Sequence, residues 1–122
     1  VENALREPAR FSVSFSVTAA SQARWLRETW RIDFTPRLIE LLSRDPAPHR
    51  TRRIRRRSAT EFEIGCGAWR AVFMVDAEKV FVSALEAAYP MKFLRRADYL
   101  HVPDREAQLA FLAQYPGRPA LP

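Results

Sequence analysis

Two consecutive segments between residues 61 and 76 alternate their side chains with a period of two, and a third segment, from Lys79 to Leu85, is rich in valine and phenylalanine. Only two short connections separate the three segments. A period of two residues is typical of strands with one buried face, and connections this short join antiparallel neighbours. The pattern therefore predicts a three-stranded antiparallel meander, in which Cys66 is a small core residue. The inward positions of the first two strands are Phe62, Ile64, Cys66, Trp69, Ala71, Phe73 and Val75.

The segment before the meander predicts one more strand and two helices. Residues 11–17 alternate phenylalanine or valine with serine, which indicates a half-buried strand. Residues 19–30 have helical spacing, with Ser21 as the expected N-cap. Thr35 and Pro36 begin a second helix that ends before the prolines of residues 46–48. Residues 30–34 fit either a short strand or a continuation of the first helix.

The chain is therefore expected to be a single α+β domain of residues 1–122, in the order β-α-α-β-β-β. Two N-terminal helices pack on one face of a small antiparallel sheet of about four strands. The opposite face, or the concave edge of the sheet, stays open for a ligand. The core spans about residues 11–89. Residues 90–122 form a C-terminal helical extension, whose last helix begins after Asp104 as N-cap.

Composition narrows the class of protein. Hydrophobic residues make up 48% of the chain, enough for a packed core, yet no apolar run reaches the roughly 20 residues that cross a bilayer. A signal-peptide pattern is not recognisable, and the one cysteine, Cys66, has no internal partner for a disulfide. We expect a cytoplasmic protein that does not enter a membrane. The sequence has neither a set of ligand residues with metal-binding spacing nor a glycine-rich loop. We therefore expect no metal and no cofactor.

The net charge of +6 comes from one short segment. Without the six arginines of residues 50–57, the 20 basic residues fall to 14, equal to the 14 acidic residues. Such a local excess attracts a polyanion, and arginine binds phosphate oxygens bidentately. The alternative is a solvated, flexible connection, although Ile54 in its middle favours a strand or turn anchored to the core. The candidate nucleic-acid-binding residues are Arg50, Arg52, Arg53, Arg55, Arg56 and Arg57.

Arg70 is the leading candidate for a catalytic residue. It alternates with Trp69 and therefore points to the open face of the sheet. A guanidinium group held on a rigid strand is suited to stabilising charge on a phosphate in a transition state. The alternative is a structural salt bridge across the strands, to Glu63 or Glu61.

Further donors and titratable groups follow the last strand. Tyr89 and His101 are candidate proton-transfer residues, because a histidine titrates near neutral pH. His49 is a weaker candidate of the same kind. A surface or packing role is the alternative for each of them. Lys92, Arg95 and Arg96 extend the candidate nucleic-acid-binding set, and Tyr99 lies among them.

The order of elements and the meander resemble the RelE/ParE toxin superfamily of bacterial toxin–antitoxin modules. The resemblance covers residues 11–85 and rests on Phe62-Glu63-Ile64-Gly65, on residues 69–76 and on Lys79-Val80-Phe81-Val82. Arg70 matches the arginine that the family's nucleases use on the scissile phosphate. Glu63 and Gly65 stand where those nucleases have basic residues, and Tyr89 matches their last-strand residues only in part.

The resemblance implies a RelE-like toxin that cleaves mRNA on the ribosome and so inhibits translation, with a cognate antitoxin as its partner. In that function Arg70 would stabilise the phosphorane, Arg53 and Arg55 would hold the RNA backbone, and Tyr89 or His101 would transfer protons. Two alternatives remain. One is a ParE-like toxin directed at gyrase, or a non-catalytic nucleic-acid-binding member of the fold. The other is a general RNA- or DNA-binding domain outside the family.

Overall fold

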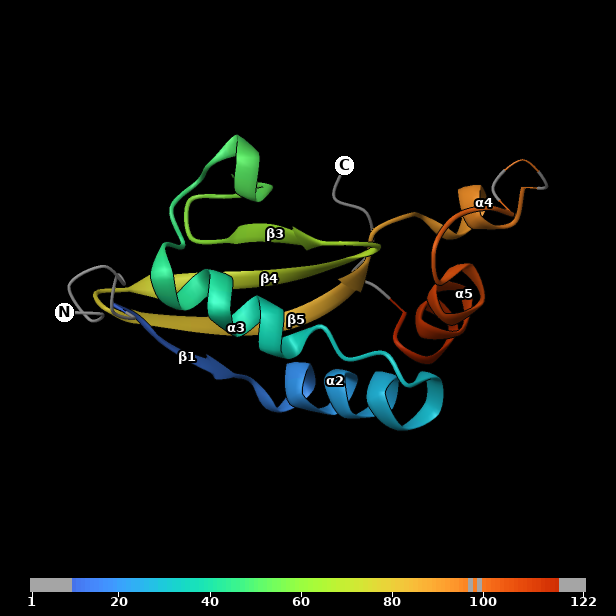
Figure 1. Ribbon diagram of the computed structural model, residues 1–122, viewed down its shortest axis with the longest axis horizontal. Coiled ribbons are helices and arrows are strands. Elements are labelled where there is room, and N and C mark those ends of the chain that lie inside the picture. Colours follow the sequence, from blue (N-terminus) through green and yellow to red (C-terminus); the bar gives the residue numbers. More distant parts are fainter. Residues whose placement is uncertain (1–9, 97, 99, 117–122) are drawn as a thin grey trace, which may run out of the picture.

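The computed structural model describes residues 10–96, 98 and 100–116, together with all of their side chains except that of Arg52. These residues form a five-stranded mixed sheet with strand order β1-β5-β4-β3-β2, and helices pack against it (Figure 1). The strands are β1 (Ser12–Phe15), β2 (Ile54–Arg56), β3 (Phe62–Cys66), β4 (Trp69–Asp76) and β5 (Lys79–Ala87). The helices are α2 (Val17–Trp30), α3 (Thr35–Arg44), the short 3-10 helix η1 (Arg50–Arg52), α4 (Met91–Leu94) and α5 (Arg105–Gln114). None of the described helices is long and apolar enough to cross a bilayer.

The α+β class and the antiparallel meander of β3, β4 and β5 are confirmed. The sheet differs from the predicted one in two features. The sheet has five strands rather than about four, because Ile54 and its neighbours pair with β3 as β2. It is also mixed rather than antiparallel, because β1 pairs with β5 in parallel. The long segment between these two strands lets the chain return in the same direction, which a hairpin cannot do.

The first helix begins earlier than the sequence predicted. Ser16, and not Ser21, is its N-cap, and the Ser16 hydroxyl accepts a hydrogen bond from the backbone N–H of Ala19 at 3.0 Å. The same hydroxyl donates to the carbonyl of Ser83 at 2.7 Å, so the cap also ties α2 to β5. The helix ends at Trp30, and Arg31 follows in the left-handed conformation with φ of 56°. The ambiguous segment after Trp30 is therefore neither strand nor helix.

The N-cap side chains expected for the other two helices do not cap them. Thr35 is the first residue of α3, and its backbone N–H and hydroxyl both donate to the Asp33 carboxylate, at 3.2 and 2.6 Å. Asp104 does precede α5, but its carboxylate makes no capping bond. It accepts a hydrogen bond from Trp69 Nε1 at 2.9 Å instead. Asp33 therefore binds the first residue of α3 from the preceding loop, and Asp104 joins the start of α5 to β4.

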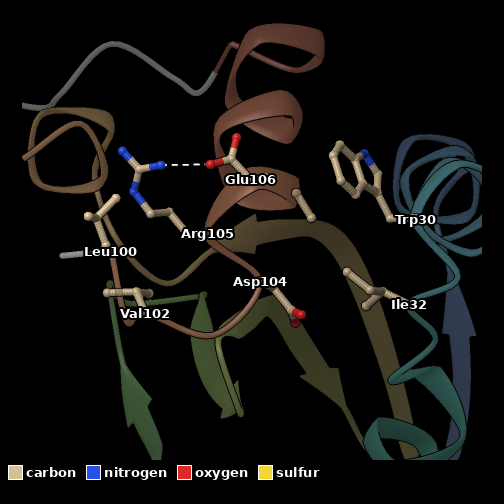
Figure 2. A pocket seen from close by; sticks show the side chains of 8 residues that line it. Trp30, Ile32, Leu100, Val102, Asp104, Arg105 and Glu106 are labelled. Atoms are coloured by element: carbon tan, nitrogen blue, oxygen red, sulfur yellow. Dashed lines mark hydrogen bonds and ion pairs between the residues drawn. The ribbon is translucent and has the colours of Figure 1, made fainter. Parts of the chain in front are cut away.

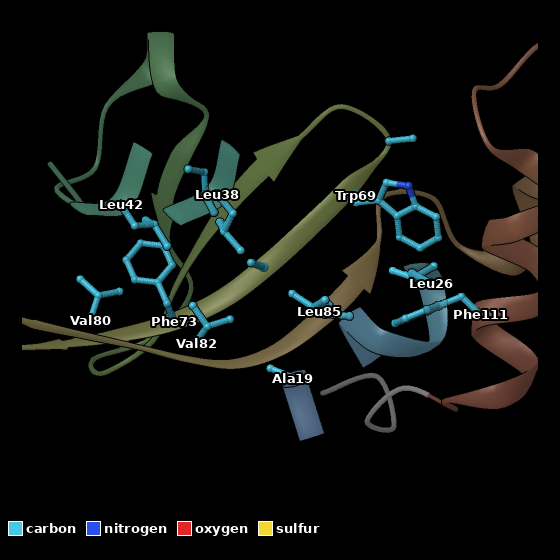
Figure 3. Close-up of a cluster of buried hydrophobic side chains, with 14 of the residues drawn as sticks. Ala19, Leu26, Leu38, Leu42, Trp69, Phe73, Val80, Val82, Leu85 and Phe111 are labelled. Carbon is cyan, nitrogen blue, oxygen red and sulfur yellow. The ribbon is translucent and has the colours of Figure 1, made fainter. Parts of the chain in front are cut away.

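The core lies between the sheet and the helices, and Trp69 stands at one end of it (Figure 3). Its ring stacks on Phe34, before α3, with centroids 6.1 Å apart, and it meets Phe111 of α5 edge-on at 5.3 Å. The indole N–H is satisfied by Asp104, so this aromatic residue can be 98% buried without a polar cost. Trp69 therefore joins the sheet, the loop before α3 and the C-terminal helix.

Replacing Trp69 with alanine should lower the free energy of unfolding by about 3–5 kcal/mol, because it removes a large buried ring and leaves a cavity. Urea denaturation followed by circular dichroism measures the change. Arg44→Ala, at an exposed position of α3, is the control and should change stability by less than about 0.5 kcal/mol. A loss under about 1 kcal/mol at Trp69 would contradict its place in the core.

Candidate nucleic-acid interface

The sheet has a second face, which points away from the core. Strand pairing places Arg55 opposite Glu63, and it places Arg70 between Gly65 and Glu86. Directly paired residues point to the same face of a sheet, so these side chains share the face opposite Ile64, Ala71 and the other core residues. The expected position of Arg70 on the face opposite Trp69 agrees with this pairing.

Three arginines converge on one carboxylate of this face. The Glu63 side chain is only 8% exposed, and its oxygens lie 3.0 Å from Arg55 Nε and 3.7 Å from both Arg57 Nε and Arg70 Nε. Arg57 also donates to the Glu86 carboxylate at 3.0 Å. The salt bridge between Arg70 and Glu63, which the sequence allowed as an alternative to catalysis, is thus present.

These ion pairs orient the arginines without using all of their donors. A guanidinium group has five N–H bonds, and about a third of the Arg57 and Arg70 side chains and two thirds of the Arg55 side chain remain exposed. The three arginines and two glutamates leave one net positive charge. The group can therefore accept an anion, but the acidic residues reduce its charge well below that expected from the arginine segment alone.

Arg53 extends this group along the sheet. A Cβ atom at Gly65 would lie 2.7 Å from the guanidinium carbon of Arg53, so the arginine occupies the space that a side chain would fill. Gly65 pairs with Arg70, which places the Arg53 guanidinium on the same face as Arg70. Arg53 Nη1 also donates to the Gly67 carbonyl at 3.3 Å. We call Arg53, Arg55, Arg57 and Arg70, with Glu63 and Glu86, the arginine face.

The remaining members of the arginine segment point elsewhere, so the segment is not one surface. Arg56 alternates with Arg55 and stacks over the Phe62 ring at 5.2 Å, on the other side of the sheet. Arg50 lies in η1, whose N-cap His49 accepts from the Thr51 backbone N–H at 3.3 Å. The side chain of Arg52 lies outside the described residues. Arg55 and Arg56 point to opposite faces because successive side chains of a strand alternate, and Arg50 lies outside the strand in η1.

The predicted residues after β5 lie outside the sheet. Tyr89 precedes α4, and its backbone N–H donates to the buried Gln108 side chain at 3.2 Å. His101 lies in the turns between α4 and α5. Lys92 approaches the Phe93 ring at 5.2 Å, and Arg95 is exposed at the end of α4. Tyr99 lies outside the described residues.

Arg96 forms a local ion pair. Its Nε and Nη2 atoms donate to the two oxygens of Asp98, both at 3.1 Å. This hydrogen bonding holds the pKa of Asp98 below its ordinary value, and the nearby charge of His101 acts in the same direction. Arg96 is thus partly neutralised by a carboxylate two residues away. Among the described residues, no three histidine, cysteine or acidic side chains gather closely enough to hold a metal ion.

Sequence reasoning missed Glu86 as a member of the site. It lies on β5, 29 residues from the arginine that it binds, so no local pattern connects the two. Only the pairing of Arg70 with Glu86 brings β5 to this position. The alternation of Leu85 and Glu86 places the glutamate on the open face, but it does not predict which arginine the glutamate binds.

Comparison with known proteins supports the fold and not a family. No protein-family profile and no curated protein matches the chain. Two crystal structures of TrmO, one of them from P. aeruginosa, align over 68% of this chain with TM-scores of 0.50 at 14% and 15% identity. The chain spans only 36–37% of their length. The toxin–antitoxin complex RelBE2 from Mycobacterium tuberculosis aligns over 68% of this chain and 98% of its own, with a TM-score of 0.45 and 18% identity.

Replacing Glu63 with alanine should lower the free energy of unfolding by about 1–3 kcal/mol, because three oriented guanidinium groups lose their shared acceptor. Chemical denaturation measures the loss. Glu28→Ala, an acid-to-alanine change at an exposed position of α2, is the control and should have an effect within about 0.5 kcal/mol. Equal stability of the two variants would show that the ion pairs around Glu63 contribute nothing.

Proposed function

We propose that this chain binds the phosphate backbone of RNA through the arginine face. The observation that supports it is the convergence of Arg55, Arg57 and Arg70 on the Glu63 carboxylate. A carboxylate and a phosphate present similar oxygen pairs to a guanidinium fork, so an arrangement that holds one suits the other. Arg55 lies in β2, Arg57 directly follows β2, and Arg70 lies in β4. The sheet therefore sets the spacing of the three arginines, and binding needs little reorganisation.

Glu63 has two effects on such binding. It orients the arginines, which lowers the entropy that RNA binding costs, and it competes with phosphate for the same donors. The net charge of the face is small, so affinity depends on the exposed N–H groups of Arg55 and Arg70 more than on long-range attraction. Binding should still weaken with salt, because each phosphate contact releases counterions.

We further propose a RelE-like toxin that acts on mRNA at the ribosome and has a cognate antitoxin. In this reaction the ribose 2′-hydroxyl attacks the adjacent phosphorus, a new P–O bond forms, and the 5′-oxygen leaves with a proton. Arg70 would stabilise the charge that develops on the phosphorane. Tyr89 or His101 would exchange the protons. The motif around residues 62–82 supports this proposal, together with the position of Arg70 on the open face.

A second function, a binding module without chemistry, is favoured by one specific observation. Arg70 already faces the Glu63 carboxylate at 3.7 Å, which partly neutralises the charge that catalysis would need. Such a module would bind nucleic acid or, as in the ParE branch, be directed at gyrase. The two functions share the fold and differ in what Arg70 does.

The triple change Arg55→Ala, Arg57→Ala and Arg70→Ala should abolish most binding of a single-stranded RNA oligonucleotide. Each lost phosphate contact should also flatten the slope of log affinity against log salt by about 0.7. Fluorescence anisotropy across a salt series measures both. Arg24→Ala, Arg27→Ala and Arg44→Ala together remove the same charge from exposed helix positions and serve as the matched control. Equal losses in the two triple variants would show that only net charge matters.

In the toxin proposal, Arg70→Ala should slow mRNA cleavage by about 10²–10³, as loss of one preorganised donor does. Arg70→Lys should restore little, since a single ammonium cannot replace a bidentate fork. Primer extension after induced expression locates the cuts, and thermal melts confirm that the variants fold. Full toxicity of folded Arg70→Ala would contradict the nuclease. DNA damage without mRNA cuts would favour the gyrase-directed alternative.

A further inference from the structure

A cavity of about 600 Å³ lies where the loop before α3, the start of α3 and the turn between β3 and β4 meet. Its volume falls within the range of about 300–1,000 Å³ typical of small-molecule sites. Phe34, Leu41 and Trp69 provide apolar walls, and Arg37 and Arg53 provide positive charge. Cys66, the one cysteine of the chain, borders the same space.

The charges around this cavity are not equally available. The Asp33 carboxylate accepts two hydrogen bonds from Thr35, and Asp104 accepts one from the Trp69 indole. Arg37 makes a long contact with Glu40 at 3.5 Å, where both side chains are at least half exposed and water screens the pair. The two guanidinium groups therefore retain donors for a ligand, whereas the two carboxylates are already engaged by neighbouring donors.

The pKa of the Cys66 thiol responds to the charges of the two arginines. Burial raises its pKa above the ordinary value, and the charges of Arg53 and then Arg37 act in the opposite direction. Both arginines thus place positive potential at the cavity wall where Cys66 lies. The wall combines this potential with the rings of Phe34 and Trp69, which stack on each other and both line the cavity.

A second, smaller cavity nearby provides a contrast. It has a volume of about 390 Å³ and shares Ile32 and Asp104 with the first. Its arginine, Arg105, donates to Glu106 at 2.7 Å. Figure 2 marks this hydrogen bond by a dashed line. The charge of that arginine is therefore balanced within the cavity itself. Of these two cavities, the first is the one lined by two arginines.

Arg53 connects the first cavity to the arginine face. Its guanidinium group lies over Gly65, beside Arg70, and the same residue lines the cavity. A strand of RNA whose backbone follows the arginine face would therefore reach the cavity opening at Arg53. The missing side chain of Gly65 keeps this route open, because a Cβ atom there would displace the guanidinium.

We propose that this cavity binds one nucleotide, with the base against Phe34 and the phosphate between Arg37 and Arg53. Bases stack on aromatic rings whatever their sequence, and guanidinium forks bind phosphate oxygens bidentately. The nucleotide can be free or can belong to an RNA strand, and the second form rests on the proposed RNA-binding function. The cavity then holds one base of the strand that the arginine face binds by its backbone.

Thiol labelling tests the proposal, because Cys66 is the one cysteine in the chain. Neutral iodoacetamide at pH 8 should label it at a rate set by access to the cavity. AMP at about ten times its dissociation constant should slow labelling about tenfold, since only the unoccupied fraction reacts. Adenosine and inorganic phosphate, tested separately at the same concentration, should protect much less. Equal protection by adenosine and AMP would overturn the role of the arginines.

Arg37→Ala should raise the AMP concentration that gives half-maximal protection about tenfold or more, because a charged hydrogen-bond donor is lost. Each variant is compared with its own rate without ligand, since removing this charge raises the Cys66 pKa and slows labelling by itself. Arg44→Ala, an arginine at the end of the same helix, is the control and should leave protection unchanged. Equal protection in Arg37→Ala and the wild-type chain would contradict the proposed phosphate site.

An RNA hexanucleotide, followed both by anisotropy and by labelling, separates this proposal from the RNA-binding function. Binding together with protection of Cys66 supports both. Binding without protection by either RNA or AMP overturns the cavity site and leaves the arginine face. Protection by AMP without RNA binding supports a site for free nucleotides and overturns the RNA-binding function. Neither binding nor protection overturns both.

Discussion

Burial of the Trp69 side of β4 is the constraint on which the other features depend. Trp69, Ala71 and Phe73 all point into the core, and Trp69 contacts the loop before α3, the helix α5 and the Asp104 carboxylate. Because strand side chains alternate, this arrangement forces Arg70 onto the other face. The same burial brings Phe34 to the edge of the hairpin, where it forms a wall of the larger cavity.

In the arginine face, acidic residues of neighbouring strands orient the side chains of a charged segment. In the sequence, six arginines occur without an acidic neighbour, and mutual repulsion would favour an extended connection. In the fold, Glu63 from β3 and Glu86 from β5 supply the missing charges at 3.0 Å from Arg55 and Arg57. Neutralisation removes the repulsion, while the partly exposed guanidinium groups keep donors for a phosphate. A structural and a functional role of Arg70 are therefore compatible, since its salt bridge with Glu63 can hold the guanidinium group in position to bind a phosphate.

The arginine face and the cavity meet at one residue. Arg53 directly precedes β2, and its backbone has the left-handed conformation, with φ of 58°. Its side chain lies over Gly65. A longer side chain at that position of β3 would push the guanidinium away from both sites. A glycine inside a strand is unfavourable for the strand itself, and the close approach of Arg53 provides a reason for it here.

Periodicity in the sequence was sufficient for the meander, for the two N-terminal helices, for the inward position of Trp69 and for the outward position of Arg70, because these depend on neighbours two to four residues away. Three features depended on the tertiary structure. The parallel pairing of β1 with β5, the convergence of Arg55, Arg57 and Arg70 on Glu63, and the contact of Arg57 with Glu86 all join distant segments. Alternation tells which face a side chain occupies, but strand order and register decide which charges meet on that face.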